Sequence, residues 1–254
     1  MLRLTLITLL SLGLTGKETI NPAGTRVSDR IRVPAGYERM PDATNSFSAY
    51  LGGLKLKPDG TPVKLFNGQL KARQDVHCAV VDIPVGKQDL QQCADAVMRL
   101  RGEYLFRQKR YADIHFNFLA DGKPHTYEAF AKGKHDYPRF MQYMEYVFRS
   151  ANTASLLQEL KPVGHLEEML PGDVFIQKGN PYGHAEIVLD VAVNPKTGKK
   201  IFLLAQSYMP AQDIHILVNP RNATLSPWYE LNASSPISTP EWQFFPEDLR
   251  RFRD

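Results

Sequence analysis

The most regular pattern of apolar and polar positions in the chain predicts a helix between residues 89 and 110. Apolar residues recur there every three or four positions, the spacing of one helix face: Leu90, Cys93, Ala94, Val97, Leu100, Tyr104 and Leu105. Asp89, with Gln92 three residues later, has the spacing of a capping box. Lys109 and Arg110 are cations of the kind that stabilise a helix C-terminus. We therefore expect a helix capped by Asp89, with Cys93 in its first turn.

Two further helices are predicted after this one. Residues 138–150 place a set of apolar side chains on one side of a helix: Phe140, Tyr143, Met144, Val147 and Phe148. A shorter helix follows the capping residues Asn152 and Thr153 and ends near Leu160.

β-Branched and apolar runs bounded by turn residues predict strands in much of the remaining chain. These runs are residues 62–66, 76–83, 114–118, 172–176, 184–192, 201–206 and 214–218. The last four follow one another with turns between them, which is typical of an antiparallel meander. The sequence therefore predicts the α+β class, with helices packed on an antiparallel sheet.

The chain is expected to hold one folded domain. Residues 17–46 are rich in Pro, Gly, Thr and Arg and show little periodicity, so we expect an N-terminal lead-in there. Residues 47–254 contain no obvious linker and no internal repeat. A single α+β domain over this range is the simplest interpretation.

The first 16 residues have the pattern of a secretory signal peptide. Arg3 precedes a mostly apolar run over residues 4–14, and the small residue Gly16 follows it. A membrane-spanning helix needs roughly 20 apolar residues, and this run is shorter. No later segment is long and apolar enough to span a membrane either. We expect an exported, periplasmic or extracellular protein; the alternative is a buried N-terminal helix or strand.

Composition and charge exclude several classes of protein. With 43% hydrophobic and 23% charged residues, the chain resembles neither collagen, nor a coiled coil, nor a disordered protein. The 31 basic and 27 acidic residues leave a net charge of +4 without a long basic run, so we expect no nucleic-acid partner. Two cysteines are too few for a disulfide scaffold or a four-cysteine zinc site. The spacing of His77, His115, His184 and His215 matches no zinc motif, so neither a metal nor another cofactor is expected.

Three residues suggest thiol chemistry. The positive end of a helix dipole stabilises a thiolate, so Cys93 is a candidate nucleophile; its alternative role is packing on the apolar face. His184 opens a strand directly after a glycine-containing turn and is a candidate base, or else a surface histidine of a hairpin. Gln206 ends the next strand and could orient the imidazole, as Asn does in Cys-His-Asn sites. Asp190 and Asp213 are rival orienting residues.

This order of cysteine, histidine and polar residue is the papain-like order, and two family resemblances accompany it. Residues 172–176 and 183–188, a Gly-Asp and a Gly-His each followed by an apolar run, resemble the NlpC/P60 and CHAP cell-wall hydrolases. Residues 89–97, 114–118 and 204–213 look like the bacterial DUF4846 family, whose likeness extends over nearly the whole mature chain. The first resemblance implies a papain-like fold and hydrolytic activity, whereas the DUF4846 family name describes no activity.

Several polar residues lie in or beside these family-like segments: Arg99, His115, Asn117, Ser207, Tyr208 and Gln212. His115 and Asn117 alternate along one strand and so share a face of it. We expect this set either to line a substrate groove or to form a buried hydrogen-bond network.

Together these observations indicate an exported papain-like thiol hydrolase that acts on amide bonds. The expected location and the NlpC/P60 resemblance imply peptidoglycan peptides as its substrate. The alternative is a non-catalytic envelope protein that binds a peptide or glycan on a papain-like scaffold. A disulfide between Cys78 and Cys93, permitted in an oxidising compartment, would remove the nucleophile.

Overall fold

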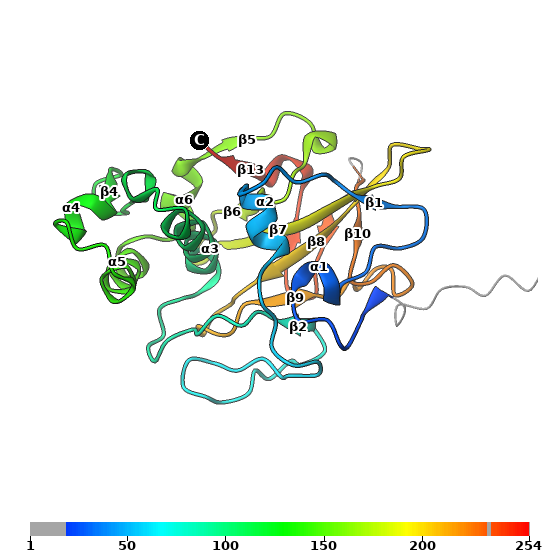
Figure 1. Cartoon of the computed structure of the whole chain (residues 1–254), viewed down its shortest axis with the longest axis horizontal. Coiled ribbons are helices and arrows are strands. Elements are labelled where there is room, and N and C mark those ends of the chain that lie inside the picture. Colours follow the sequence, from blue (N-terminus) through cyan, green and yellow to red (C-terminus); the bar gives the residue numbers. More distant parts are fainter. Residues whose placement is uncertain (1–18, 233–234, 254) are drawn as a thin grey trace, which may run out of the picture.

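The computed structural model describes residues 19–232 and 235–253 of the chain, in which helices accompany a large antiparallel sheet. The α+β class predicted from the sequence is therefore confirmed (Figure 1). The expected signal peptide, residues 1–16, lies outside the described residues. Within the described ranges, no helix has the length and apolar character needed to cross a membrane.

The main sheet contains nine strands of the described chain and is antiparallel throughout. The strands are β1 (Glu38–Arg39), β2 (His77–Val80), β5 (Leu160–Pro162), β6 (Val174–Gln177), β7 (His184–Val193), β8 (Lys200–Gln206), β9 (His215–Leu217), β10 (Tyr229–Glu230) and β13 (Leu249–Phe252). Their order is β2-β9-β8-β7-β6-β13-β5, with β1 paired to β7 and β10 paired to β8. The expected meander is confirmed as the consecutive neighbours β6 to β9.

Two small sheets accompany the main one. The strands β3 (His115–Asn117) and β4 (Pro124–Thr126) form one hairpin, and β11 (Ile237–Ser238) and β12 (Gln243–Phe244) form the other. The predicted strand at residues 114–118 thus belongs to the β3–β4 hairpin and not to the main sheet.

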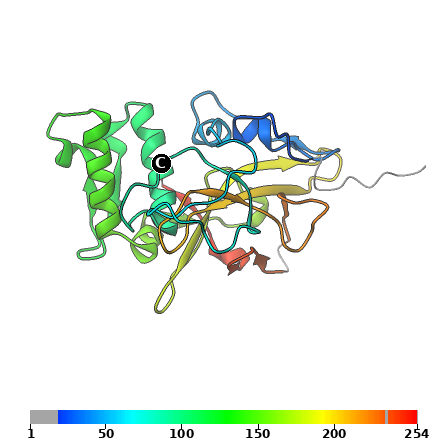
Figure 2. The ribbon, with the colours of Figure 1, turned by 90° about the horizontal axis from the view of Figure 1, so that it is seen from below.

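Most helices gather at one end of the molecule (Figure 2). The α-helices are α1 (Val27–Arg30), α2 (Phe47–Gly52), α3 (Cys93–Arg107), α4 (Tyr127–Ala131), α5 (Tyr137–Ser150) and α6 (Thr153–Glu159). Single 3₁₀ turns are η2 (Tyr111–Asp113), η3 (Leu166–Glu168) and η4 (Pro246–Asp248). The helices α3 to α6 form the end group, while α1 and α2 lie over one face of the sheet. The helix α3 also packs against β7, which joins the helical group to the sheet.

The central strands are buried on both faces. In β7, Ile187 and Leu189 contribute to the larger apolar cluster, which includes residues of α3 and α5. The residue between them, Val188, belongs to a second cluster together with Phe175 and Phe244. Because successive side chains of a strand point to opposite faces, this division explains why β7 has an almost continuous apolar sequence.

Two local predictions were wrong. The helix α3 begins at Cys93, with Gln92 as its N-cap, and not near Asp89. Asp89 instead accepts hydrogen bonds from Gln92 Nε2 (3.0 Å) and from the Ala211 amide (2.7 Å), so its carboxylate ties the loop before α3 to a distant segment. The predicted strand at residues 62–66 is a loop with only isolated bridges, between Lys64 and Leu70 and between Leu65 and Gln212.

The other two helix predictions are confirmed. Asp136 caps α5 by accepting from the Arg139 amide at 2.8 Å, and Pro138 occupies the first turn, where its missing N–H costs nothing. Asn152 caps α6 through the amides of Ala154 and Ser155.

Candidate functional site

Cys93 occupies the first position of α3 and is 8% exposed. The Asp95 carboxylate accepts from the Gln92 amide at 3.1 Å and so stabilises the helix start beside the thiol. The Sγ atom lies 3.9 Å from the carbonyl oxygen of Gly183. The N-terminal turn of α3 thus places the thiol next to the turn between β6 and β7.

His184 is the first residue of β7, and its side chain approaches the Cys93 thiol from the sheet. Its partner across the β6–β7 hairpin is Gln177. Gly183 immediately precedes it, and a Cβ atom there would lie only 2.2 Å from the Gln177 carbonyl oxygen, so a residue with a side chain does not fit. The His184 side chain is 2% exposed, and it lies close enough to the Cys93 side chain for that thiol to raise the pKa of the imidazole. The structure therefore brings together the two residues predicted to form the nucleophile and the base.

Gln206 is the last residue of β8 and completes a line of three side chains. Ile187 of β7 pairs with Ala205 of β8, so the next residue, Gln206, lies diagonal to His184 on the neighbouring strand. Its Oε1 atom is 2.7 Å from His184 Nε2. The rival residues lie elsewhere, in ion pairs: Asp190 with Arg39 at 2.7 Å and Asp213 with Lys57 at 2.9 Å.

The surroundings of His184 favour its charged form. Burial acts to lower the pKa of His184, but hydrogen bonds to Cys93 and Glu186, together with their charges, outweigh it and raise the pKa to about 10. The nearest carboxyl oxygen, Glu186 Oε1, lies 3.4 Å from Nε2 and also accepts from Thr239 Oγ1 at 2.9 Å. An imidazolium at His184 is the form that would stabilise a thiolate at Cys93.

Three aromatic side chains enclose the imidazole of His184. Ring centroids of Tyr208, Trp242 and Phe244 lie 4.9, 5.1 and 6.0 Å from that of His184. They restrict the ring's orientation and keep water from most of its surface. Access from solvent is consequently left to the thiol side.

A cavity of about 200 Å³ opens on that side. Its lining includes Cys93, Asp95, Phe148, Tyr182 and Met209, and His184 is not part of it. A molecule bound there would therefore contact the sulfur before the imidazole.

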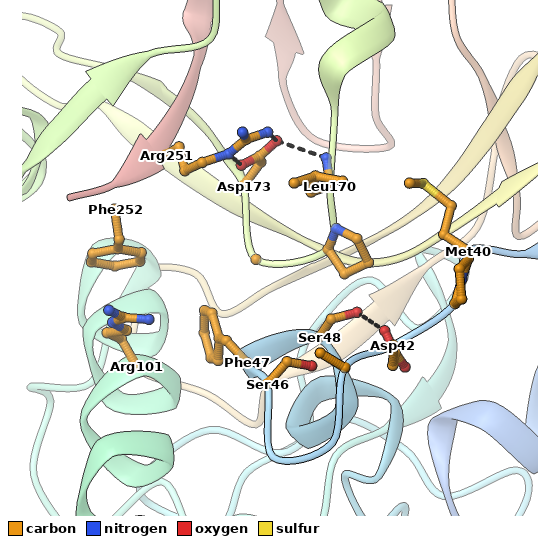
Figure 3. Close-up of a pocket in the computed structure, with 14 residues that line it drawn as sticks. Met40, Asp42, Ser46, Phe47, Ser48, Arg101, Leu170, Asp173, Arg251 and Phe252 are labelled. Atoms are coloured by element: carbon orange, nitrogen blue, oxygen red, sulfur yellow. Dashed lines mark hydrogen bonds and ion pairs between the residues drawn. The ribbon is translucent and has the colours of Figure 1, made fainter. Parts of the chain in front are cut away.

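Another cavity, of about 290 Å³, lies away from the thiol and is drawn in Figure 3. Asp173 receives two hydrogen bonds from Arg251 there, and Ser48 donates to Asp42. Its described lining contains no cysteine or histidine. The polar pairs in this cavity are thus engaged with one another, and the cavity lacks the thiol and imidazole groups found at the Cys93 site.

Three of the residues predicted to bind substrate belong to one buried hydrogen-bond network. Arg99 bonds to Glu103, Tyr137 and the side chain of Gln91. Ser207 Oγ donates to the backbone carbonyls of Gln91 and Gln212, and both Ser207 and Gln212 are fully buried. These contacts match the buried network that was the alternative to a groove, and none of the three residues lines the cavity beside Cys93.

Of the remaining residues in that set, Tyr208 packs beside His184, and His115 and Asn117 lie on β3. His115 is exposed, and its Nε2 lies 3.5 Å from Glu159 Oε2. The backbone N–H of Asn117 also donates a hydrogen bond to Glu159 Oε1. Neither residue lines the cavity beside Cys93. The Glu159 carboxylate at the end of α6 thus contacts two residues of the β3–β4 hairpin.

Neither a disulfide nor a clustered metal site occurs in the part of the chain that the structure describes. Cys78 and Cys93 are both free. No three His, Cys, Asp or Glu side chains of the described ranges gather as metal ligands would, although the rings of His77 and His215 lie 5.9 Å apart.

Sequence reasoning missed part of the surroundings of His184. Glu186 lies two residues after His184 on the same strand, so strand alternation could have placed both on one face. Glu241 and Trp242 come from an irregular segment some 35 residues beyond Gln206, and no periodic signal points to them.

Comparison with known proteins identifies the family. Searches of curated proteins and of solved structures each found no match. A family model described as a domain of unknown function, DUF4846, matches residues 27–251, which include every strand and helix named above except the last residue of β13. The match covers far more than half of the chain and agrees with the resemblance carried by residues 89–97, 114–118 and 204–213. The chain therefore belongs to the DUF4846 family.

Proposed function

We propose that the protein is an exported thiol hydrolase that cleaves amide bonds, on a scaffold arranged as in papain-like enzymes. The observation that carries the proposal is the line of interacting side chains from Cys93 through His184 to Gln206, in which His184 Nε2 lies 2.7 Å from Gln206 Oε1. A nucleophile on a helix N-terminus, a base on a strand and an orienting amide on the next strand form the arrangement that activates a cysteine.

The chemistry follows from which nitrogen of His184 faces which partner. Nε2 contacts Gln206, so in this proposal Nδ1 is the nitrogen that exchanges a proton at the sulfur of Cys93. The Cys93 thiolate attacks the amide carbonyl carbon, and the C–N bond breaks as the Nδ1 proton passes to the departing amine. Water then attacks the thioester, His184 accepts a proton from it, and the C–S bond breaks to return Cys93 and release the acid.

Backbone amides at the start of α3 would stabilise the oxyanion formed in both steps. The first N–H groups of a helix have no carbonyl partner within the helix, and the helix dipole places partial positive charge there. Because Cys93 is the first residue of α3, a carbonyl carbon bonded to its sulfur would bring its oxygen near these groups.

Cell-wall peptides are the substrate class that we propose. This part rests on the expected export and on the resemblance of residues 172–176 and 183–188 to NlpC/P60 and CHAP hydrolases. The cavity beside Cys93 has apolar walls in Phe148 and Met209 and a carboxyl group in Asp95, so it offers both apolar and polar contacts to a peptide.

One observation favours the second candidate, a non-catalytic envelope protein that binds a peptide or glycan. Cys93 and His184 are both largely buried, which is also what packing residues would be. In this alternative the cavity holds a ligand without cleaving it.

Incubation of the mature protein with purified peptidoglycan fragments, followed by mass spectrometry, separates the two candidates. We expect cleavage products from the unaltered protein and from Cys78→Ala, and none from Cys93→Ala. Cys78→Ala is the matched control because it removes the other free thiol. Binding of the fragments without cleavage by the unaltered protein would instead support the envelope binding protein.

A further inference from the structure

Charged and polar side chains contact the Gln206 amide on the side away from His184. Gln206 Nε2 donates to Glu241 Oε2 at 2.7 Å and lies 3.2 Å from His215 Nε2. Lys71 Nζ donates to the other oxygen of Glu241 at 2.8 Å. His215 is fully buried, and the Lys71 and Glu241 side chains are nearly so. These groups therefore interact in a region with little water, where hydrogen-bond direction is strongly selected.

Counting donors and acceptors fixes the orientation of the Gln206 amide. A carboxylate only accepts, so the Gln206 NH₂ group must face Glu241. His215 Nδ1 lies 2.8 Å from the Asp213 carbonyl oxygen, which also only accepts, so Nδ1 carries a proton. Burial lowers the pKa of His215 to about 3 and keeps the ring neutral, which leaves its Nε2 as an acceptor for the second Gln206 N–H.

With both N–H groups engaged, Gln206 can present only its Oε1 atom to His184. Oε1 is an acceptor, so His184 Nε2 must carry a proton at 2.7 Å from it. In the neutral imidazole the other nitrogen, Nδ1, then has the free lone pair, and the proposed mechanism uses this lone pair to accept the Cys93 proton. The opposite orientation of the amide would aim an N–H group at Nε2 and favour the tautomer that cannot take a proton from the thiol.

We propose that Glu241, held by Lys71, and His215 are positioning residues that lock the Gln206 amide and thereby set the tautomer of His184. The three residues do not touch the sulfur; they act through Gln206. This inference rests on the proposed function in one respect: the residues whose geometry is set, Cys93 and His184, are the proposed nucleophile and base. Its readouts, thiol labelling and histidine spectroscopy, do not depend on hydrolysis.

Ionisable groups from several elements belong to or face the line of side chains from Cys93 to Gln206. They are Cys93 from α3, Glu186 from β7, Tyr208 after β8, His77 from β2, His215 from β9, and Lys71 and Glu241 from loops. A substitution that alters only Glu241 leaves the direct partners of His184 in place.

The test is the pH dependence of Cys93 labelling by iodoacetamide in Glu241→Gln. A glutamine at 241 can bond to either end of the Gln206 amide, so the orientation is no longer fixed. We expect the labelling profile to move to higher pH by about one unit, a roughly tenfold slower rate at neutral pH. Asp75→Asn, which breaks the exposed Arg73–Asp75 pair near Lys71, is the matched control and should leave the profile unchanged.

A double variant separates positioning from simple loss of packing. In Gln206→Glu with Glu241→Gln the acceptor and donor exchange places, and a carboxylate at 206 accepts from His184 Nε2 in any orientation; His215 must then take up a proton on Nε2 to donate to this carboxylate. We expect this pair to restore the labelling profile. An unchanged profile in Glu241→Gln, or a loss that the double variant does not restore, would overturn the proposal.

A spectroscopic measurement covers the case in which Glu241→Gln fails to fold. Cys93→Ala removes the thiol that helps to hold His184 charged, and ¹⁵N NMR of labelled histidines then reports the neutral tautomer. We expect the proton of His184 on Nε2; a proton on Nδ1 would refute the positioning role. If labelling and tautomer behave as expected while cell-wall fragments stay intact, the positioning inference stands and the proposed hydrolase fails.

Discussion

The two cysteines of the chain illustrate how strongly the surroundings of one residue type decide its chemistry. Cys78 lies on β2 in a strand environment, where burial raises the pKa of its thiol to about 12. Cys93 lies at the first position of α3, beside His184, whose surroundings raise the pKa of its imidazole and favour the imidazolium. Burial thus disfavours a thiolate at Cys78, whereas Cys93 has a cationic neighbour, the kind of group that activates a cysteine.

This contrast predicts selective alkylation at near-neutral pH. Iodoacetamide should label Cys93 at least about tenfold faster than Cys78, because the thiolate is the reactive species. His184→Ala should slow labelling of Cys93 by removing the imidazolium, and should leave Cys78 unaffected. Peptide mapping by mass spectrometry measures both sites at once. Equal and slow labelling of the two thiols, unchanged in His184→Ala, would assign Cys93 to packing.

His215 predicts a specific dependence of stability on pH. Its pKa of about 3 in the folded protein lies below the value of about 6.5 expected after unfolding, so unfolding takes up a proton between these values. This contribution to the free energy of unfolding is present above about pH 6.5 and is lost as the pH falls towards 3.

Urea denaturation at pH 7 and pH 5 tests this dependence. Other groups also titrate in this range. The quantity to compare is therefore the change in the free energy of unfolding between the two pH values, measured in the unaltered protein and in His215→Gln. The variant lacks the titrating group, and we expect the acid-induced loss of stability to be smaller in it by about 2 kcal/mol. The same pH effect in both proteins would mean that His215 is not held neutral by the fold.

At the level of single residues, the sequence was informative where a side chain's place in an element decides its role. Cys93 and His184 were found because one starts a helix and the other starts a strand after a glycine turn. Gln206 was found because it ends the strand next in order. Glu241 and Lys71 could not be found in this way, since they lie on irregular segments whose approach depends on the complete fold.

At the level of elements, the contact between α3 and α5 depends on a glycine. A Cβ atom on Gly102 would lie 3.0 Å from Met144 Sδ and 3.4 Å from Phe140 Cζ, both on buried side chains of α5. The glycine lets the two helices approach closely, and it does so on the helix whose first residue is Cys93.

We expect Gly102→Val to lower the free energy of unfolding by about 1–3 kcal/mol, because the added methyl groups overpack this contact. The matched control is Gly52→Val in α2, where the nearest atom to a new Cβ is 4.0 Å away. Thermal and urea unfolding of the two variants give the comparison. If the two variants had the same free energy of unfolding, the close approach of α3 and α5 at Gly102 would contribute nothing to stability.

The elements that were predicted correctly are those with a strong local pattern. The strands β6 to β9 combine apolar runs with turn residues, and α5 and α6 have capping residues and, in α5, an apolar face. The start of α3 was misplaced because Asp89 has a long-range partner, the Ala211 amide, that competes with capping. Strands of two to four residues such as β1, β10 and β13 have too few positions to show alternation, and tertiary pairing alone defines them.

For the molecule as a whole, export is the property that most constrains the proposed substrate. The apolar run at residues 4–14 and the small residue Gly16 predict removal of the first 16 residues during secretion. Fractionation with N-terminal sequencing should find a chain that begins near residue 17 outside the cytoplasm. A cytoplasmic protein that retains Met1 would contradict export and remove the support for cell-wall peptides.

The position of β13 in the sheet has a consequence for the order in which the chain acquires its structure. This strand pairs with β6 on one side and β5 on the other, although it follows both by more than seventy residues. During synthesis β5 and β6 emerge long before β13, the strand that lies between them in the sheet. Their backbone groups stay open to wrong partners in the meantime, so a holding chaperone should matter more for this protein than for one whose neighbouring strands are all consecutive.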